Sequence, residues 1–274
     1  MNASNLAVKS TAKLSLKNKY TSGIIAASVF VFALIVCSFC VGMTGTVFGK
    51  AGMYISALAF LIFLIIPLLA GYVYWGVRLV FTGESEPVLI FKYFSGKTHY
   101  LKSLKLSVVI TGNLLLTGII LFLPYIFTDL LASGKLFVLF GAQIPIWASS
   151  LWTVARFLKD VAFVALFFAS LKYYLAPFLI AADEEMDPLE AIHMSKIISG
   201  GSKRSFIALA FSLILYIAAC FLVIPIIFIF PYFTAAYAVH CRFAVASYNK
   251  SVDSINRDDV PSFSADISFW VIVC

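Results

Sequence analysis

Charge is scarce in this chain of 274 residues. Lys, Arg, Asp and Glu together make up 12% of the sequence and apolar residues 62%, whereas soluble domains carry about 25% and about 45–50%. So little charge does not cover the surface of a soluble protein of this length. Charge is absent altogether from residues 23–49, 51–77, 106–128 and 205–241. A helix needs about 20 apolar residues to cross a bilayer, so the sequence predicts an all-α membrane protein.

Candidate catalytic and metal-binding residues are also few. The three histidines, His99, His193 and His240, lie in separate segments, and none stands at ligand spacing from another histidine, a cysteine or a carboxylate. Cys37 and Cys40 form a C-x-x-C inside an apolar run, without a basic neighbour to make either thiol reactive, so we interpret them as packing residues. H-E-x-x-H, G-x-S-x-G and glycine-rich phosphate loops are absent. The sequence therefore predicts no enzyme, and neither a metal nor a cofactor site.

The apolar runs predict a polytopic bundle of about six spans in one domain, residues 1–248, followed by a tail at 249–274. The first run follows a basic N-terminus but exceeds the 7–15 residues typical of a signal-peptide core, so we interpret it as a span. A turn is expected around Lys50. Proline breaks the run 205–241 at Val223-Ile224-Pro225, with one kinked span as the alternative. The expected spans are 23–47, 52–78, 104–126, 158–182, 204–222 and 226–248.

Lysine and arginine are distributed unequally over the two sides of this topology. With both termini inside, the outer side keeps four of the twenty basic residues, namely Lys50, Lys135, Arg156 and Lys159. Loops rich in Lys and Arg stay in the cytoplasm, so we predict a multi-pass protein of the cell membrane with cytoplasmic termini. The inner basic residues face anionic lipid headgroups in this prediction, and no nucleic acid partner is expected.

Several segments lie between or beyond the predicted spans. The loop 82–103 predicts a short interfacial helix at Pro87–Phe94. The outer piece LFVLFGAQIPIW, residues 136–147, is too short to span and is interpreted as re-entrant or interfacial, with Trp147 and Trp152 as headgroup-level anchors. The tail ends in SFWVIVC, which either docks on a surface or is disordered, and the residues favour neither.

The most polar stretch in the body of the chain is DEEMDPLEAIHMSKIISGGSKRSF, from Asp183 to Phe206. Asp187 is expected to cap a helix that has Pro188 at its first position and Glu190 at its third. This helix, about 188–199, is expected to end at Gly200-Gly201. One face carries Ala191, Met194, Ile197 and Ile198, and the other carries His193, Ser195, Lys196 and Ser199.

We call this cytoplasmic segment the elbow and predict that it docks a partner. The residues expected to do so are Asp183, Asp187, Glu190, Ser195, Lys196, Lys203 and Arg204. Its carboxylates are interpreted as a helix cap and solvated charge rather than as a divalent-cation site.

The elbow together with the ten residues before it, YYLAPFLIAADEEMDPLEAIHMSKIISGGSKRSF, resembles the signature of an uncharacterised bacterial membrane family, the domain-of-unknown-function 975 family. AKLSLKNKY, LIFKYFSGKTHYLKSL and PYFTAAYA resemble further parts of it. Two features depart from the family: Val223-Ile224-Pro225 replaces a glycine-containing turn, and 127–155 looks like an insertion. The elbow is also similar to one in the membrane domain of some glycerophosphodiester phosphodiesterases, whose hydrolase domain this chain does not resemble. The positions that match the signature are Tyr174, Ala182-Asp183, Glu190-Ala191-Ile192, Ser195-Lys196, Gly200 or Gly201, Lys203 and Phe206.

Lys172 is the sharpest feature inside a predicted span. It lies ten residues from the inner end of 158–182, about 15 Å deep at helical rise, where a charge costs about 2.5–3.5 kcal/mol. Asn113 on the third span is a candidate partner, so the two predict a polar path. Snorkelling of the lysine, or a shifted span, is the alternative.

Two functions follow from these features. We expect a non-enzymatic accessory or scaffold protein of the bacterial cell membrane that docks a membrane-protein partner through the elbow and the loop 82–103. The alternative is a small transporter or channel with a polar path near Lys172. Polar residues at the midplane are few and no convincing repeat relates the two halves, which favours the first.

Overall fold

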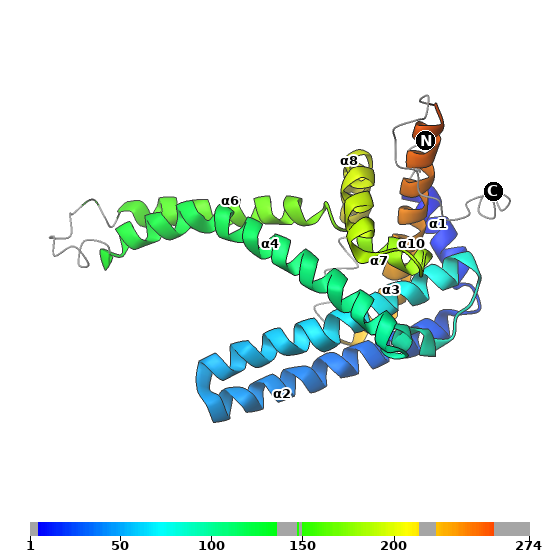
Figure 1. The fold of residues 1–274 in the computed structure, drawn as a ribbon, viewed down its shortest axis with the longest axis horizontal. Helices are drawn as coiled ribbons and strands as arrows, with labels where there is room; N and C mark the ends of the chain where they lie inside the picture. The colour runs from blue at the N-terminus through cyan, green and yellow to red at the C-terminus, as the bar shows by residue number, and fades with distance from the viewer. Residues whose placement is uncertain (1–4, 136–146, 148–149, 214–222, 255–274) are drawn as a thin grey trace. The chain divides into compact units, whose positions relative to one another are not determined.

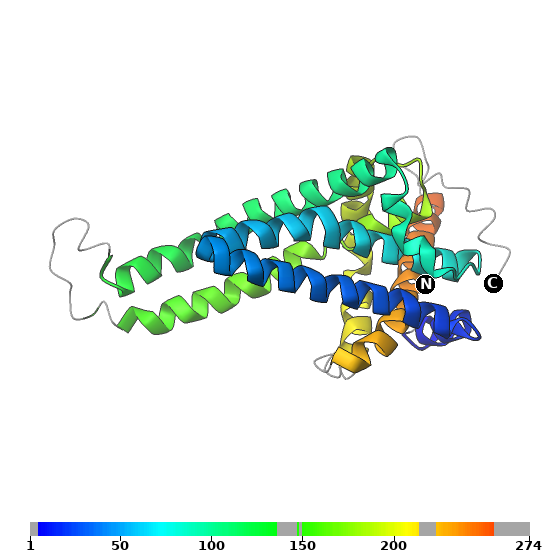
Figure 2. The same ribbon diagram turned by 90° about the horizontal axis from the view of Figure 1, so that it is seen from below.

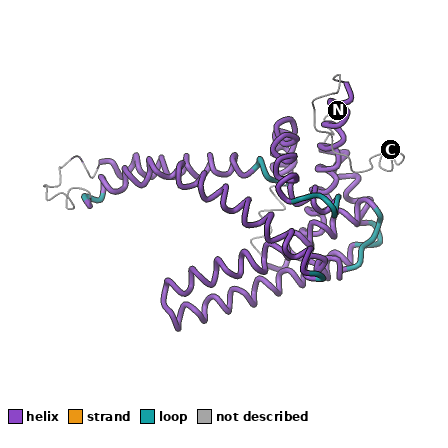
Figure 3. Tube along the Cα trace, in the orientation of Figure 1, coloured by secondary structure: helices purple, strands orange, loops and turns teal. Residues whose placement is uncertain are grey.

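The computed structural model describes residues 5–135, 147, 150–213 and 223–254, and they form helices joined by short turns (Figure 3). No strand occurs in this part of the chain, which confirms the all-α class. The chain divides into two compact units, Met1–Val108 with Tyr173–Cys274, and Val109–Lys172. The single domain expected over residues 1–248 stays a prediction.

The first unit is built on a long helical hairpin. α2 (Tyr20–Phe60) continues through a π-helical turn, η1 (Leu61–Ile65), into α3 (Ile66–Phe81), and the chain reverses within α2 at Gly49. Gly49 has φ 69° and ψ −166°, a backbone conformation that is essentially restricted to glycine. The two arms lie side by side in Figures 1 and 2, as expected for helices joined by a turn near Lys50.

Five further helices enclose one end of this hairpin. We call this end together with the five helices the base. They are α1 (Asn5–Leu16), η2 (Pro87–Phe94), α7 (Ala176–Ala182), α8 (Pro188–Ser212) and α10 (Val223–Ser254). Apolar side chains from all of these except α7 meet those of α2 and α3 in one buried core. That core comprises Val8, Ala12, Leu16, Ala26, Ala27, Tyr72, Trp75, Leu79, Ile90, Leu209, Leu213, Ala235, Ala236 and Val239.

Two glycines on α3 permit close packing in the base. The backbone of Ile90 in η2 lies directly over Gly71, and the side chain of Thr234 in α10 lies over Gly76. A Cβ at Gly76 would be 2.5 Å from Thr234 Cγ2, so α3 presents a bare backbone where its neighbours cross it.

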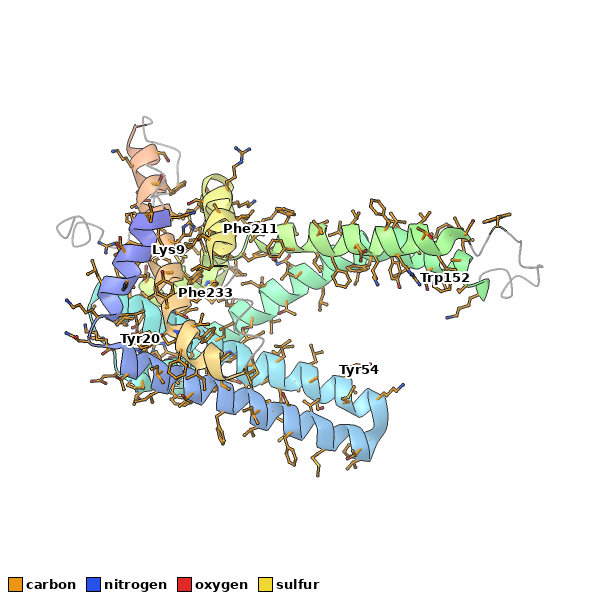
Figure 4. All side chains as sticks on the ribbon, turned by 180° about the vertical axis from the view of Figure 1, so that it is seen from behind. Lys9, Tyr20, Tyr54, Trp152, Phe211 and Phe233 are labelled. Carbon is orange, nitrogen blue, oxygen red and sulfur yellow. The ribbon has the colours of Figure 1, made fainter. Side chains whose placement is uncertain are left out.

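The second unit is a pair of helices. The later part of α4 (Lys97–Ala132) faces α6 (Leu151–Ser170), and the rings of Phe122 and Phe163 meet edge to face with centroids 4.9 Å apart. Trp152 at the start of α6 is 43% exposed (Figure 4). The predicted re-entrant piece 136–147 lies outside the described residues except for Trp147.

Two segments of the described chain are long and apolar enough to cross a bilayer. They are Tyr20–Phe81, which contains the turn at Gly49, and Lys97–Ala132. Length and composition therefore favour a membrane location, but they do not support six spans.

The expected boundaries need three corrections. The predicted span 158–182 is interrupted, because α6 ends at Ser170 and α7 begins at Ala176. Pro177 has no N–H to donate, which removes one helical hydrogen bond at this point. α4 begins at Lys97 rather than at about residue 104, whereas η2 at Pro87–Phe94 confirms the short helix expected in the loop.

The third correction concerns the end of the elbow helix. α8 continues through Gly200-Gly201 to Ser212. Two glycines cost a helix about 1 kcal/mol each relative to alanine, but the buried side chains of Ile198, Ser199 and Leu209 hold the helix against its neighbours on both sides of them. Of the predicted fifth span 204–222, the part up to residue 212 lies in α8, and residues 214–222 lie outside the described chain.

The position of α10 does not support the six-span topology. The hydroxyl of Tyr20, at the inner end of the predicted first span, donates to the carbonyl of Phe228, which that topology places at the outer end of the sixth. A bilayer core of about 30 Å would separate two such residues. The rings of Phe30 and Phe230 also stack with centroids 5.3 Å apart, so the start of α10 lies at the base of the hairpin.

Candidate functional site

The acidic turn of the elbow is fastened to α3 and η2 through Glu184. Its Oε1 accepts hydrogen bonds from the Tyr74 hydroxyl at 2.6 Å and from Arg78 Nη2 at 3.0 Å. Its Oε2 pairs with Lys92 Nζ at 3.0 Å. Tyr74, Arg78, Lys92 and Glu184 form what we call the Glu184 cluster, which joins segments about 100 residues apart in sequence.

Local structure places each partner of Glu184. Tyr74 and Arg78 are four residues apart on α3 and therefore share a face, and Arg78 Nε donates to the Tyr74 hydroxyl at 2.9 Å. Lys92 comes from η2, whose buried Ile90 and Tyr93 fix it against α3. Both cations also lie near the Tyr74 ring, 5.2 Å and 5.5 Å from its centroid, within the range of cation–π attraction.

The cluster changes the protonation of Glu184. Partial burial alone raises the pKa of this carboxyl, but the hydrogen bonds from Tyr74, Lys92 and Arg78 and the charge of Lys92 outweigh it and lower the pKa from 4.5 to about 2. Glu184 is therefore an anion at neutral pH, and it is the anchor for two basic side chains.

Two lysines of α4 fasten the same turn from a second direction. Lys102 Nζ donates to the Glu184 carbonyl at 2.6 Å and to the Glu185 carbonyl at 3.3 Å. One turn further on, Lys105 Nζ pairs with Asp187 at 2.9 Å. Asp187 Oδ2 also accepts from Leu189 N at 3.0 Å, which confirms it as the N-cap of α8. The pKa of Asp187 is lowered, chiefly by the hydrogen bond from Lys105 and then by the backbone hydrogen bond from Leu189.

Some of the predicted elbow residues are held by contacts or burial within the chain, and the others are partly or fully exposed. Asp183 and Asp187 make contacts within the turn, where Asp183 accepts from Glu185 N at 2.9 Å. Ser195 is fully buried. Glu190, Lys196 and Arg204 are exposed, and Lys203 is half-buried.

The predicted faces of the elbow helix are partly wrong. Ser195 and Ser199 are buried, although they were expected on the polar face, and Ile197 is 38% exposed, although it was expected on the apolar face. The side that packs in the base therefore follows Ala191, Ser195, Ile198 and Ser199, because a serine is small enough to fit where α8 approaches its neighbours closely.

Lys172 and Asn113 both belong to the second unit. Lys172 lies in the non-helical break between α6 and α7 and is exposed, so it is not enclosed in the middle of a span. Asn113 uses its side-chain amide to donate to Val109 O of its own helix at 2.9 Å. The polar path between them stays a prediction.

A cavity of about 380 Å³ lies between α8 and α10. Its polar lining comes from Ser202, Ser205, Ser247, Ser251, His240 and Tyr248. Behind it the Tyr174 hydroxyl lies 2.7 Å from Ser202 Oγ and 3.4 Å from His240 Nε2. The sequence analysis did not single out this cavity, because no motif marks hydroxyls that come together from two distant helices.

The Glu184 cluster was also missed from sequence. The carboxylates of residues 183–187 were interpreted as a cap and solvated charge, but Glu184 and Asp187 are ion-paired within the chain. The available signal was charge complementarity between this acidic turn and the basic residues from 92 to 105, namely Lys92, Lys97, Lys102 and Lys105.

The described residues form helices, with an apolar hairpin and a base. Besides its apolar core, the base has ion pairs that join the elbow to α3, η2 and α4. Within the described residues, no three His, Cys, Asp or Glu side chains are grouped to hold a metal ion. Comparison with protein families, curated proteins and solved structures finds no match. The resemblance to the domain-of-unknown-function 975 family therefore stays a prediction.

Proposed function

We propose that this chain is a non-enzymatic accessory or scaffold protein of the bacterial cell membrane that docks a membrane-protein partner through its base. The observation that carries the proposal is the fastening of the elbow to η2 and to the start of α4 by Glu184, Lys102 and Asp187. These contacts make one preformed surface from two polar segments.

The docking surface is formed by the side chains that these contacts leave exposed. On α8 these are Glu190, Lys196 and Arg204, and Lys196 lies 5.4 Å from the Tyr173 ring centroid. On η2 they are Val88, Phe91 and Phe94, which are 71%, 43% and 36% exposed. Their spacing of three residues places them on one ridge of a 3₁₀-helix. An exposed apolar patch of this kind marks an interaction site.

The proposal retains the expected orientation, in which the base is cytoplasmic and its lysines face anionic headgroups. Membership of the resembled family belongs to the same proposal. The transport alternative rests on Lys172 and Asn113, and neither lines the cavity between α8 and α10.

The test is co-purification in mild detergent of the intact chain and of a triple variant, Glu190→Ala, Lys196→Ala and Arg204→Ala. These changes leave the Glu184 cluster and the Asp187 cap in place. The matched control carries Lys13→Ala in α1 and Lys17→Ala in the turn that follows it, and both lysines are exposed. We expect a stoichiometric partner that the triple variant loses and the control keeps. Absence of any partner from all three preparations would overturn the docking proposal.

A further inference from the structure

The hairpin of the first unit has apolar side chains exposed along both arms beyond the base. On the outgoing arm these are Phe32, Ile35, Val36, Phe39, Met43, Val47 and Phe48, and on the returning arm Tyr54, Ile55, Leu58, Leu61 and Phe63, each 43–72% exposed. Figure 4 shows Tyr54 near the turn and Tyr20 at the opposite end. Such a surface is far larger than the isolated apolar patches of a soluble protein.

The burial of side chains on the returning arm changes near Ile66, where α3 begins. From Pro67 to Leu79 most of its side chains are buried against the base. Polar contacts accompany α3 here, as where Arg78 Nη2 donates to Glu184. The last of them toward the turn is just beyond α3, where the Tyr100 hydroxyl donates to Phe63 O of η1 at 3.0 Å. Charged groups such as Lys92 are costly to place in hydrocarbon, so the boundary of the bilayer lies where these contacts end.

The projecting part has the length of a bilayer core. Residues 32–48 and 51–66 span about 26 Å and about 24 Å at helical rise, against about 30 Å of hydrocarbon. Lys50, the one charged residue between Tyr20 and Val77, stands at the turn, where a long side chain reaches toward headgroups. The small mismatch is of the size that a bilayer accommodates by local thinning.

The start of α10 lies at the other end of the hairpin from Lys50. Besides the Tyr20–Phe228 hydrogen bond, the side chain of Pro231 packs on Gly23, where a Cβ would lie 2.7 Å from Pro231 Cβ. Lys9 of α1 donates to the Ser212 carbonyl at the end of α8 at 3.1 Å. Both ends of the connection between α8 and α10 are therefore tied to the base.

We propose that, of the residues the structure describes, the first unit places only the hairpin from about Phe32 to Ile66 in the bilayer, with Lys50 at the far face, and that α1, η2, α8 and the start of α10 stay together on the near face. This rests on the membrane location in the proposed function and goes beyond it by assigning the lipid-facing segment. It replaces the sixth predicted span, and the described part of the fifth, with helices that pack beside the hairpin base.

The test compares three single cysteines in a background with the native cysteines changed to alanine. Lys13→Cys marks the base, Lys50→Cys the turn and Phe228→Cys the start of α10; Phe228 is 47% exposed. Sealed cells and opened membranes are treated with a membrane-impermeant maleimide. We expect Lys13→Cys and Phe228→Cys to be labelled from the same side and Lys50→Cys from the opposite side, whichever side is the cytoplasm.

Phe228→Cys labelled from the same side as Lys50→Cys would overturn the inference and restore the six-span order. Labelling of all three from one side would show that the hairpin does not cross. A Phe39→Cys variant that reacts freely with the reagent would show that the hairpin arms lie in water. Separately, recovery of the intact chain in the soluble fraction would refute the membrane location itself, so the two failures are distinguishable.

Discussion

At the scale of single residues, glycine has opposite roles at different positions. Gly71 is covered by the backbone of Ile90, whereas a Cβ at Gly200 meets nothing within 4 Å. The same residue type is therefore a packing requirement in α3 and a weakness in α8.

Gly71→Ala is expected to destabilise the base strongly, by about 3 kcal/mol or more, because a backbone segment must move away. Gly200→Ala is the matched control and is expected to stabilise the helix by about 0.5–1 kcal/mol. Thermal unfolding of the two variants in detergent measures the difference. Equal melting temperatures would contradict the close packing of η2 on α3.

Glu184 and Glu185 are adjacent carboxylates with different surroundings. Glu184→Gln is expected to lower the free energy of unfolding by about 1 kcal/mol, because half-exposed ion pairs contribute about 0.2–1 kcal/mol each and two are lost. Glu185→Gln leaves the lysine contact to the Glu185 carbonyl in place and is expected to change stability by less than 0.5 kcal/mol. Chemical unfolding of both variants provides the comparison, and a larger loss for Glu185→Gln would refute the cluster.

At the scale of elements, α8 depends on its cap as well as on packing. Asp187 accepts a backbone hydrogen bond from Leu189 and pairs with Lys105. One side chain therefore starts the helix and ties it to α4.

Two substitutions separate these roles. Asp187→Ala removes both and is expected to destabilise the chain, whereas Asp187→Asn keeps a good capping residue and is expected to destabilise it less. Hydrogen exchange at the first turn of α8 reports on the cap directly. Equal losses of protection in the two variants would show that the ion pair, not the cap, is decisive.

At the scale of the whole molecule, the base is expected to be sensitive to acid. The pKa of Glu184 is about 2 in the folded protein and near 4.5 when its partners are absent. A lowered folded pKa stabilises the fold above the unfolded value, and this stabilisation is lost as the pH falls from about 4.5 toward 2. Melting temperature measured between pH 7 and pH 3 is expected to fall less steeply in Glu184→Gln than in the intact chain. Parallel curves would exclude Glu184 as the titrating group.

The sequence by itself determined the class of structure and several local features. The charge-free runs required helices, Lys50 marked the turn, Pro87–Phe94 was bounded correctly, and Asp187-Pro188 identified the start of α8. These features depend on neighbouring residues, so periodicity, proline and capping chemistry are sufficient to predict them.

The tertiary structure decided which helices meet and which charges pair. Hydropathy gives the length of an apolar run but not what covers it, so α10 was assigned to lipid although its start packs on Gly23 and Phe30. The partners of Glu184 come from α3 and η2, about 100 residues away. Such long-range contacts depend on how the chain folds back on itself, because no local pattern encodes the distance between two remote side chains.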